Sequence, residues 1–312
     1  MSLEPGPEPT LASAQALFVA AIGAARYEGK RAEARLWQLI LRFADDPDPG
    51  VVGLVISARA YLAMLLGYRG QWEQARSLYA VLHSQADQWA SGDLEETFAW
   101  ALYNEAMLTA LEEPARAGVL LAALAARFAT HQDPDRRALA ARAQLARGRL
   151  LPNERLSCAV AVEAQFGLDE DPAVAKQVDL ALAAQIEMLE EEDEVSLNAP
   201  ALLRASEALL ARAPGGDREI VRLPSRWQPL VAEALYARAL ALEQTDRPLE
   251  AIAAYAVMIG RTWTVHGADA ESRLRSALLH RRDLEVGTGQ LPEAQRTGQA
   301  LSERFPHSSP RG

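Results

Sequence analysis

The chain has 312 residues, 49% hydrophobic and 24% charged, which is the composition of a soluble globular protein and not of a disordered one. A formal net charge of −10 and a pI near 5.1 argue against nucleic acid as the main ligand, because such proteins need a basic field. The single cysteine, Cys158, excludes an internal disulfide and a cysteine-based metal cluster.

The beginning of the chain is rich in proline and glutamate, and we expect residues 1–10 to form a loose, disordered tail. The apolar stretch 17–25 follows, but the residues before it include Glu4 and Glu8 and no lysine or arginine. A secretory signal peptide carries the opposite charge, so we expect a cytoplasmic protein. We find no run of the roughly 18–20 uninterrupted apolar residues that a spanning helix needs, so we expect no membrane partner.

From Leu11 to Pro306 the sequence alternates helix-length segments with short breakers rich in glycine, proline and aspartate. Alanine and leucine dominate the apolar residues, and the alternating Val-Ile-Thr runs that indicate strands are nearly absent. The pattern predicts an all-α chain of about fourteen helices in seven helix–turn–helix pairs. We place these pairs at 11–44, 49–90, 93–130, 134–167, 171–213, 224–263 and 267–305.

Two segments share the pattern Y-x-G-x-x-x-x-A-R. They are YEGKRAEAR at 27–35 and YRGQWEQAR at 68–76, which lie 41 residues apart (68 − 27). We expect Gly70 to end a first helix with a positive φ, and Ala75 to let the second helix approach closely. Tyr79 and Leu82 follow on the same face of that helix. The corresponding set in the first pair is Gly29, Ala34, Gln38 and Leu41.

This pattern resembles the tetratricopeptide repeat (TPR) family, whose unit is a helix–turn–helix of about 34 residues. The sixth pair fits with Asp246 at the turn, then Ala251 and Tyr255, and the seventh fits with Gly289 and Ala294. The third, fourth and fifth pairs keep the alternation of helix-length segments and breakers but lack these motif residues. The alanine spacings of 41 (34 to 75) and 43 (251 to 294) exceed the family's unit. In period, the array is similar to helical-repeat sensor regions of bacterial signalling ATPases and transcription activators.

The resemblance implies a TPR-like α-solenoid, a right-handed superhelix in which neighbouring pairs stack because one pair cannot bury its apolar stripe alone. We expect about five pairs over 11–213 and two C-terminal pairs over 224–305 that continue the same solenoid. Residues 306–312 would be a second tail. The Pro-Gly-rich link 213–227 is either a hinge between these parts or a surface loop.

The sequence offers no convincing catalytic set. The five histidines form no i,i+3 or i,i+4 pair and no H-E-x-x-H motif. The run DDPDP at 45–49 fits a capped turn, and the G-x-G at 287–289 follows no strand. Cys158 has no histidine near it in sequence. We therefore expect a protein that is not an enzyme and that holds no metal or cofactor.

Two charged features leave alternatives open. The acidic run LEEEDE at 189–194 is either a solvated face or a contact for arginines of this chain or of a basic partner. The arginine clusters at 136–149 and 273–282 either keep the surface soluble or receive an acidic peptide.

The TPR resemblance also implies where a partner would bind, because ligands of that family usually lie in a concave groove lined by the first helix of each pair. The groove candidates that carry over are Tyr27, Met64, Tyr68, Tyr236, Leu240 and Glu243. The family positions that grip a terminal carboxylate hold residues such as Val19 and Gly23 here, so we expect no chaperone-tail binding. An apolar groove with tyrosines suits an amphipathic or extended peptide. For each residue, simple packing between neighbouring pairs is the alternative.

The leading hypothesis is a non-enzymatic scaffold or adaptor that binds a peptide or helix of another protein in its concave groove. The alternative is a ligand-sensing or oligomerising helical-repeat regulator of a bacterial signalling or transcription system. A third hypothesis, a helical enzyme, would require acids or metal ligands that converge in one cavity. The sequence leaves open whether the chain is a homo-oligomer.

Overall fold

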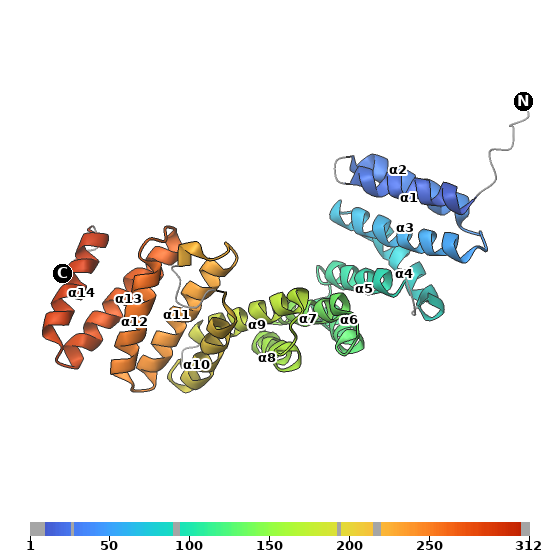
Figure 1. Ribbon diagram of the computed structural model, residues 1–312. Helices are drawn as coiled ribbons and strands as arrows, with labels where there is room; N and C mark the ends of the chain where they lie inside the picture. Colours follow the sequence, from blue (N-terminus) through green and yellow to red (C-terminus); the bar gives the residue numbers. More distant parts are fainter. Residues whose placement is uncertain (1–9, 26–27, 90–93, 192–194, 215–219, 307–312) are drawn as a thin grey trace, which may run out of the picture. The chain divides into compact units, whose positions relative to one another are not determined.

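The computed structural model describes residues 10–25, 28–89, 94–191, 195–214 and 220–306 (Figure 1). Over these residues the chain consists of fourteen α-helices and two short 3₁₀ helices, with no strand. The prediction of an all-helical chain is confirmed. The contacts divide the chain into two compact units, Met1–Glu154 (unit 1) and Arg155–Gly312 (unit 2), and each is described by itself.

The helices follow the predicted pairs closely. Unit 1 contains α1 (Leu11–Ala25), α2 (Gly29–Phe43), α3 (Pro49–Tyr68), α4 (Trp72–Trp89), α5 (Glu95–Thr109), α6 (Pro114–Phe128), α7 (Pro134–Leu150) and η1 (Pro152–Glu154). Unit 2 contains α8 (Arg155–Phe166), α9 (Pro172–Glu191), α10 (Val195–Arg212), η2 (Ile220–Arg222), α11 (Trp227–Gln244), α12 (Pro248–Thr262), α13 (Ala268–Gly287) and α14 (Leu291–Arg304).

The division between the units falls inside the expected fourth pair, 134–167, and not at the 213–227 link. The described part of that link lies within unit 2. There, η2 packs on α11 and α12, and Ile220 and Leu223 are buried. This end of the link is therefore anchored to the helices that follow it.

The helices of each unit form two rows. Within each unit, every helix packs on the next one along the chain, and odd-numbered helices also contact one another. In unit 1 these extra contacts join α1 to α3, α3 to α5 and α5 to α7; in unit 2 they join α9 to α11 and α11 to α13. Within the described residues, no even-numbered helix contacts another even-numbered helix. We call the two sets the odd row and the even row; the odd row is the more tightly spaced.

A repeated buried face explains how the second helix of a pair packs. Five of these helices begin three residues before a buried alanine, at Ala32, Ala75, Ala117, Ala251 and Ala294. Residues four and seven positions after the alanine lie on the same helix face. In four of the helices both are buried and hydrophobic, as Leu36 and Leu39, Tyr79 and Leu82, Leu121 and Leu124, and Tyr255 and Met258. The third pair, which we expected to lack the pattern, therefore keeps it.

The register that we predicted for the first pair is wrong. Ala34 and Gln38 are exposed, and Leu41 is 77% exposed to solvent. The buried residues of α2 are Ala32, Leu36, Leu39, Ile40 and Phe43.

The error has a simple cause in the turn. Gly29 is the first residue of α2, whereas Gly70 precedes α4 and has a φ of 75°. The shared letters Y-x-G therefore occupy different structural positions. Aligning the buried residues Ala32 and Ala75 gives a repeat of 43 residues (75 − 32) in place of 41.

Three turns confirm the predicted turn position. Gly70, Asp246 and Gly289 have positive φ values of 75°, 57° and 78°, and each lies five residues before a buried alanine. Glycine adopts this left-handed conformation without the steric penalty that a Cβ atom brings. Asp246 adopts the same left-handed conformation, which aspartate does more readily than most residues other than glycine.

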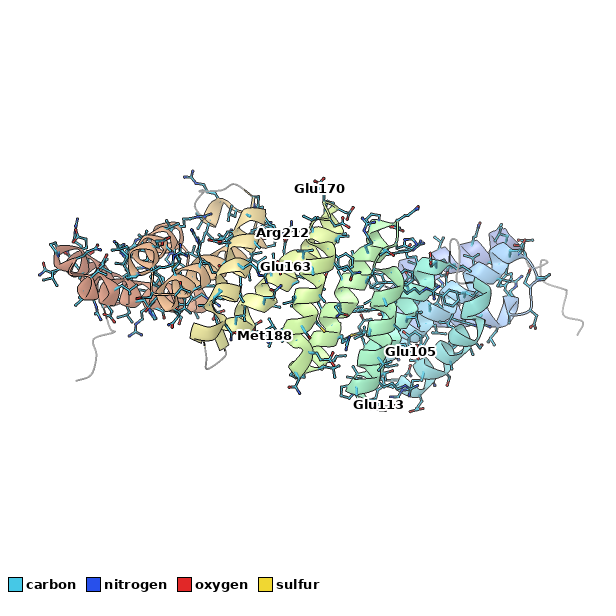
Figure 2. All side chains as sticks on the ribbon, turned by 90° about the horizontal axis from the view of Figure 1, so that it is seen from below. Glu105, Glu113, Glu163, Glu170, Met188 and Arg212 are labelled. Atoms are coloured by element: carbon cyan, nitrogen blue, oxygen red, sulfur yellow. The ribbon has the colours of Figure 1, made fainter. Side chains whose placement is uncertain are left out.

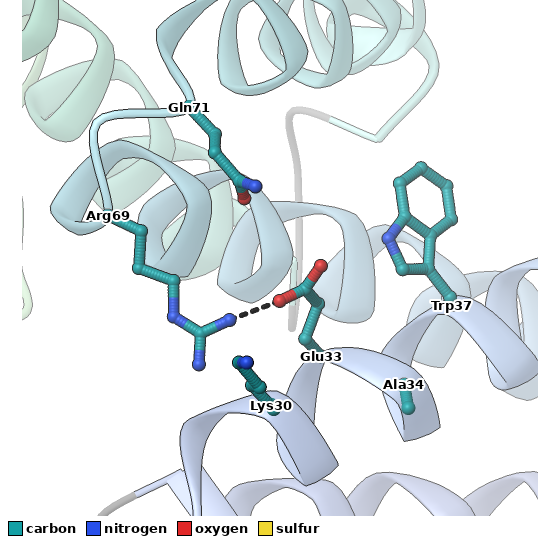
Figure 3. Close-up of a pocket in the computed structure, with 6 residues that line it drawn as sticks. All are labelled: Lys30, Glu33, Ala34, Trp37, Arg69 and Gln71. Atoms are coloured by element: carbon teal, nitrogen blue, oxygen red, sulfur yellow. Dashed lines mark hydrogen bonds and ion pairs between the residues drawn. The ribbon is translucent and has the colours of Figure 1, made fainter.

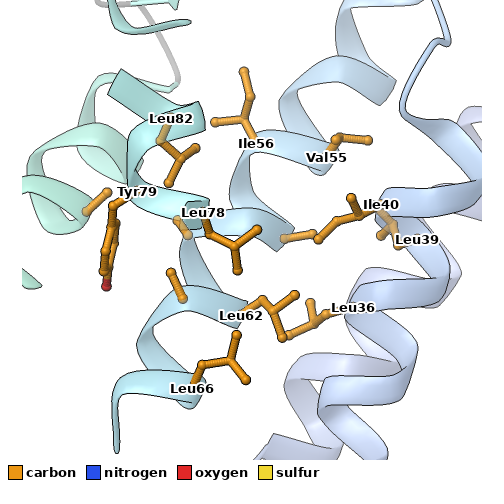
Figure 4. Packing of buried hydrophobic residues seen from close by; sticks show 14 of the residues in the cluster. Leu36, Leu39, Ile40, Val55, Ile56, Leu62, Leu66, Leu78, Tyr79 and Leu82 are labelled. Carbon is orange, nitrogen blue, oxygen red and sulfur yellow. The ribbon is translucent and has the colours of Figure 1, made fainter. Parts of the chain in front are cut away.

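The core of unit 1 lies where α2, α3 and α4 meet. Figure 4 shows Leu36 and Ile40 of α2 facing Leu62 of α3, while Leu78 and Leu82 reach in from α4. Each leucine side chain buried in this way contributes roughly 2 kcal/mol to the free energy of unfolding.

Helix α3 is the one described helix that is long and apolar enough to cross a membrane by length and composition. Its buried residues, among them Ile56 and Leu62, belong to the unit 1 core. Core helices of other proteins pass the same test, so the observation adds little to the question of a membrane.

In unit 2, Arg212 fixes the ends of two neighbouring helices (Figure 2). From α10 its guanidinium donates to the backbone oxygens of Gly167 and Ala175, each over 3.1 Å, and to Oδ1 of Asp179 over 2.7 Å. Carbonyl groups at the C-terminal end of a helix lack intrahelical donors, and the bond to Gly167, which directly follows α8, satisfies one acceptor of this kind. Arg212 thus ties α8, α9 and α10 together through one side chain.

Candidate functional site

The most conspicuous cavity of unit 1 has a volume of about 790 Å³ and lies on the odd row. Its described lining comes only from α1, α3, α5 and α7, and the even row contributes none of it. We call this cavity the aromatic groove. It is lined by Phe18, Ser57, Ala60, Tyr61, Met64, Tyr68, Glu96, Thr97, Trp100, Ala101, Tyr103, Asn104, Met107 and Arg142.

Helical spacing places these side chains on one face of each helix. On α3, Ser57, Tyr61, Met64 and Tyr68 follow one another at intervals of three or four residues. The same intervals recur on α5 from Glu96 to Met107. One face of each odd-row helix therefore lines the groove, while the other faces pack on neighbouring helices.

Two aromatic pairs shape the groove. Phe18 of α1 meets Tyr61 of α3 edge to face, with ring centroids 5.9 Å apart and planes at 82°. On α5, Trp100 and Tyr103 meet in the same way, at 5.9 Å and 78°. Such contacts are favourable geometries for aromatic rings. Tyr61 and Trp100 remain 39% and 38% exposed, so each ring keeps a face toward solvent.

Arg142 of α7 is the only cation among the described residues that line the groove. Its guanidinium carbon lies 5.5 Å from the ring centroid of Trp100 and 5.3 Å from that of Tyr103. These distances correspond to cation–π contacts. Within the described residues, Arg142 makes no hydrogen bond and no ion pair with a carboxylate.

The structure places two of the predicted groove residues, Met64 and Tyr68, on the wall of the aromatic groove. Tyr68 is 82% exposed. Tyr27 lies outside the described residues. Sequence reasoning missed the remaining aromatic residues, although the i,i+3 and i,i+4 intervals on the first helices carried a signal for them. It named Arg142 only as part of the 136–149 arginine cluster and did not connect it to the groove.

The other three predicted residues, Tyr236, Leu240 and Glu243, lie on α11 in the odd row of unit 2. All three are partly buried. Oε2 of Glu243 accepts a hydrogen bond from the Tyr255 hydroxyl over 2.8 Å, and Nδ1 of His280 lies 3.0 Å from the same oxygen. Glu243 therefore packs between neighbouring helices, which was the alternative to a role in a binding groove.

Three rings surround this carboxylate. The rings of Tyr255 and His280 are stacked with centroids 5.7 Å apart, and Tyr236 meets both of them at 6.2 and 6.5 Å. We call Glu243, Tyr255, His280 and Tyr236 the α11–α13 polar cluster. It joins three consecutive helices of unit 2.

The α11–α13 polar cluster shifts the ionisation of its members. Burial acts to raise the pKa of Glu243, but hydrogen bonds from His280 and Tyr255 outweigh it, and the pKa lies below its usual value. The hydrogen bond to Glu243 raises the pKa of His280. Burial, and then the charge of Glu243, raises the pKa of Tyr255. A charged Glu243 facing a protonated His280 is therefore favoured in the folded protein.

A smaller cavity of about 560 Å³, lined by several charged residues, lies near the start of α2 and the turn after α3 (Figure 3). Lys30, Glu33, Trp37, Arg69 and Gln71 contribute to its wall. Glu33 and Arg69 form an ion pair there, which satisfies both charges within the protein.

The acidic run at 189–194 is described only in part, because residues 192–194 lie outside the described residues. Glu190 lies 3.7 Å from Arg273 of α13, which also contacts Glu233 over 3.3 Å. This part of the run is thus in contact with an arginine of the chain itself.

Among the described residues, no group of three or more histidine, cysteine, aspartate or glutamate side chains is arranged to hold a metal ion. The chain was also compared with known proteins. No protein-family model, no curated protein and no solved structure matches it.

Proposed function

We propose that the protein is a non-enzymatic, TPR-like helical scaffold that binds a segment of another protein in the aromatic groove. The proposal depends on which helices line the groove. All of its described residues come from α1, α3, α5 and α7, the first helices of four successive pairs. Stacked helical repeats create extended binding surfaces in this way, with each repeat supplying one strip.

The chemistry of the groove supports a peptide ligand. Tyrosine and tryptophan are enriched where proteins bind one another, because they bury a large area at a small loss of side-chain entropy. Met64 and Met107 add flexible apolar surface that adapts to different side chains. From Ser57 to Tyr68, α3 contributes about 16 Å of wall, enough for roughly five residues of extended chain or three turns of helix.

The test is to pan a random peptide-display library on the immobilised full chain and to measure the affinity of the selected peptides by fluorescence anisotropy. Tyr61→Ala should weaken binding by about tenfold or more, as expected of an aromatic anchor. Tyr68→Ala provides a second variant; at 82% exposure its side chain contributes little to folding. Far-ultraviolet circular dichroism should show unchanged helicity for both.

The matched control is Trp72→Ala. Trp72 is 39% exposed, as Tyr61 is, but it lies on α4 in the even row, away from the groove. Its replacement should leave peptide affinity unchanged. Peptides that bind wild type and both tyrosine variants equally well would show that the groove is not the binding site.

The alternative proposal, a ligand-sensing or oligomerising regulator, draws support from the cavity volume of about 790 Å³, which is within the usual range for small-molecule sites. It predicts that a small ligand changes the solution size or the subunit number of the protein. Small-angle scattering with and without bound peptide or small molecule separates the two proposals, because a passive scaffold keeps its dimensions.

A further inference from the structure

We infer that the segment bound in the aromatic groove carries one acidic side chain, held by Arg142, roughly three residues from an apolar or aromatic anchor. The inference rests on the proposed function and specifies its ligand. It follows from the charge of the groove, from the geometry around Arg142 and from the helices on which the two aromatic pairs lie.

Arg142 differs from six other arginines of unit 1 in having no carboxylate partner among the described residues. Ion pairs with carboxylates occupy Arg31, Arg69, Arg76, Arg116, Arg136 and Arg147. Arg142 instead contacts only the rings of Trp100 and Tyr103 within the described part of the chain. A carboxylate from outside the chain could therefore pair with Arg142 without displacing a carboxylate of the described residues.

The two rings also prepare Arg142 for such a carboxylate. A guanidinium that lies over an aromatic face is held in place, while the N–H groups at its edge remain able to donate. Those donors match the two oxygens of a carboxylate in a bidentate pair. Because the rings restrict the side chain beforehand, less conformational entropy is lost on binding.

Glu96 limits the acidity of the ligand. Of the lining residues that the structure describes, Glu96 is the only acid, and it lies one helical turn before Trp100. It forms no ion pair with Arg142 among the described residues. A run of acidic residues would bring a second carboxylate toward Glu96 and be repelled, so the groove fits a single acid among apolar residues.

The spacing follows from the helix positions. The Phe18–Tyr61 pair joins α1 and α3, whereas Arg142 contacts the rings of α5. Adjacent packed helices lie about 8–10 Å apart, and an extended chain advances about 3.3 Å per residue. An anchor beside Tyr61 and an acid beside Arg142 are thus about three residues apart in an extended segment.

The peptide library selected on the full chain provides the test. Selected sequences should share an Asp or Glu about three positions from an aromatic or aliphatic residue. Arg142→Gln should lower the affinity of such a peptide about tenfold, and Arg142→Lys should retain part of it. Replacing the peptide's Asp by Asn should cause the same loss in wild type but little further loss with Arg142→Gln.

Arg149→Gln is the control, because it removes the same charge from an exposed position of α7 that does not line the groove. Its affinity should equal that of wild type. Amidation of the peptide's C-terminus should also have no effect, since the acid is an internal side chain. A loss on amidation alone would overturn the inference and indicate a terminal carboxylate.

The outcomes separate this inference from the proposed function. Peptides that depend on Tyr61 but bind Arg142→Gln as tightly as wild type would overturn the inference and leave the scaffold proposal standing. Selected peptides without a shared acid would do the same. If no selected peptide depends on Tyr61 or Tyr68, both proposals fail.

Discussion

The hydroxyl of Tyr255 donates a hydrogen bond to Oε2 of Glu243 over 2.8 Å, linking α12 to α11. Both groups are largely removed from solvent, since Tyr255 is fully buried and the Glu243 side chain is 23% exposed. Together with His280 of α13, this bond holds a negative charge between three helices of unit 2. The α11–α13 polar cluster is therefore a place where polar contacts govern the stability of unit 2.

Removal of that hydroxyl gives the first prediction. Tyr255→Phe keeps the buried ring but leaves one acceptor site of Glu243 empty, so the free energy of unfolding should fall by about 1.5–3 kcal/mol. Urea denaturation followed by circular dichroism measures the change. Tyr68→Phe serves as the control, because its 82% exposed side chain should contribute almost nothing through its hydroxyl.

The second prediction concerns pH. The raised pKa of His280 adds stability that is fully present below its ordinary value of 6.5 and is lost as the pH rises through the folded pKa. The lowered pKa of Glu243 adds stability that is present above its ordinary value of 4.5 and is lost as the pH falls through the folded pKa. The pair should therefore stabilise unit 2 most between these two ordinary values.

His280→Gln tests this expectation. The variant should lose more stability relative to wild type at about pH 5.5, below the ordinary pKa of histidine, than at about pH 9, well above it. Urea denaturation at the two pH values gives the comparison. An equal loss of stability at both pH values would show that His280 acts through packing and not through its charge.

A third prediction tests the corrected repeat register in α2. Ala32 is fully buried and Ala34 is exposed, although the sequence repeat pointed to Ala34. Ala32→Leu should destabilise the protein by about 1–3 kcal/mol through overpacking. Ala34→Leu should change stability by less than about 0.5 kcal/mol. Thermal or urea denaturation of the two variants decides between the registers, and the reverse ranking would restore the sequence-based one.

The fourth prediction compares two glycines that both have open space around them, since a Cβ atom added at either position would meet no other atom within 4 Å. Gly289 has a φ of 78°, so Gly289→Ala should destabilise the turn before α14 by about 1 kcal/mol. Gly260 lies within helix α12, so Gly260→Ala should stabilise the protein by about 0.5–1 kcal/mol. In chemical denaturation, the two variants should change the free energy of unfolding in opposite directions.

Much of the helical architecture could be predicted because its signals are local. Proline at the first helical position marks the starts of α7 and α12, and Asp133 caps α7 by accepting from the backbone amide of Asp135. Such contacts span two or three residues and are visible in the sequence. The register of the first pair was not visible in the sequence. Gly29 is the residue type that the turn pattern requires, but it is the first residue of helix α2 and not part of the turn before it.

The candidate site could be predicted only in part. Met64 and Tyr68 followed from their place near the end of a first helix, but Trp100 and Arg142 meet across 42 residues of sequence (142 − 100). The contact of Glu243 with His280 spans 37 residues. No local pattern specifies which distant helix face receives a side chain, so these partnerships depend on packing that the sequence does not display.

The repeated alanine and its two apolar companions lie on second helices, whereas the residues of the aromatic groove lie on first helices. The recurrent alanine and its companions thus record how the chain folds, and apart from Tyr68 the groove residues do not belong to the repeated motif. A partner would meet an aperiodic surface on a periodic framework. Substitutions could therefore change what the groove recognises, helix by helix, while the motif that builds each pair stays intact.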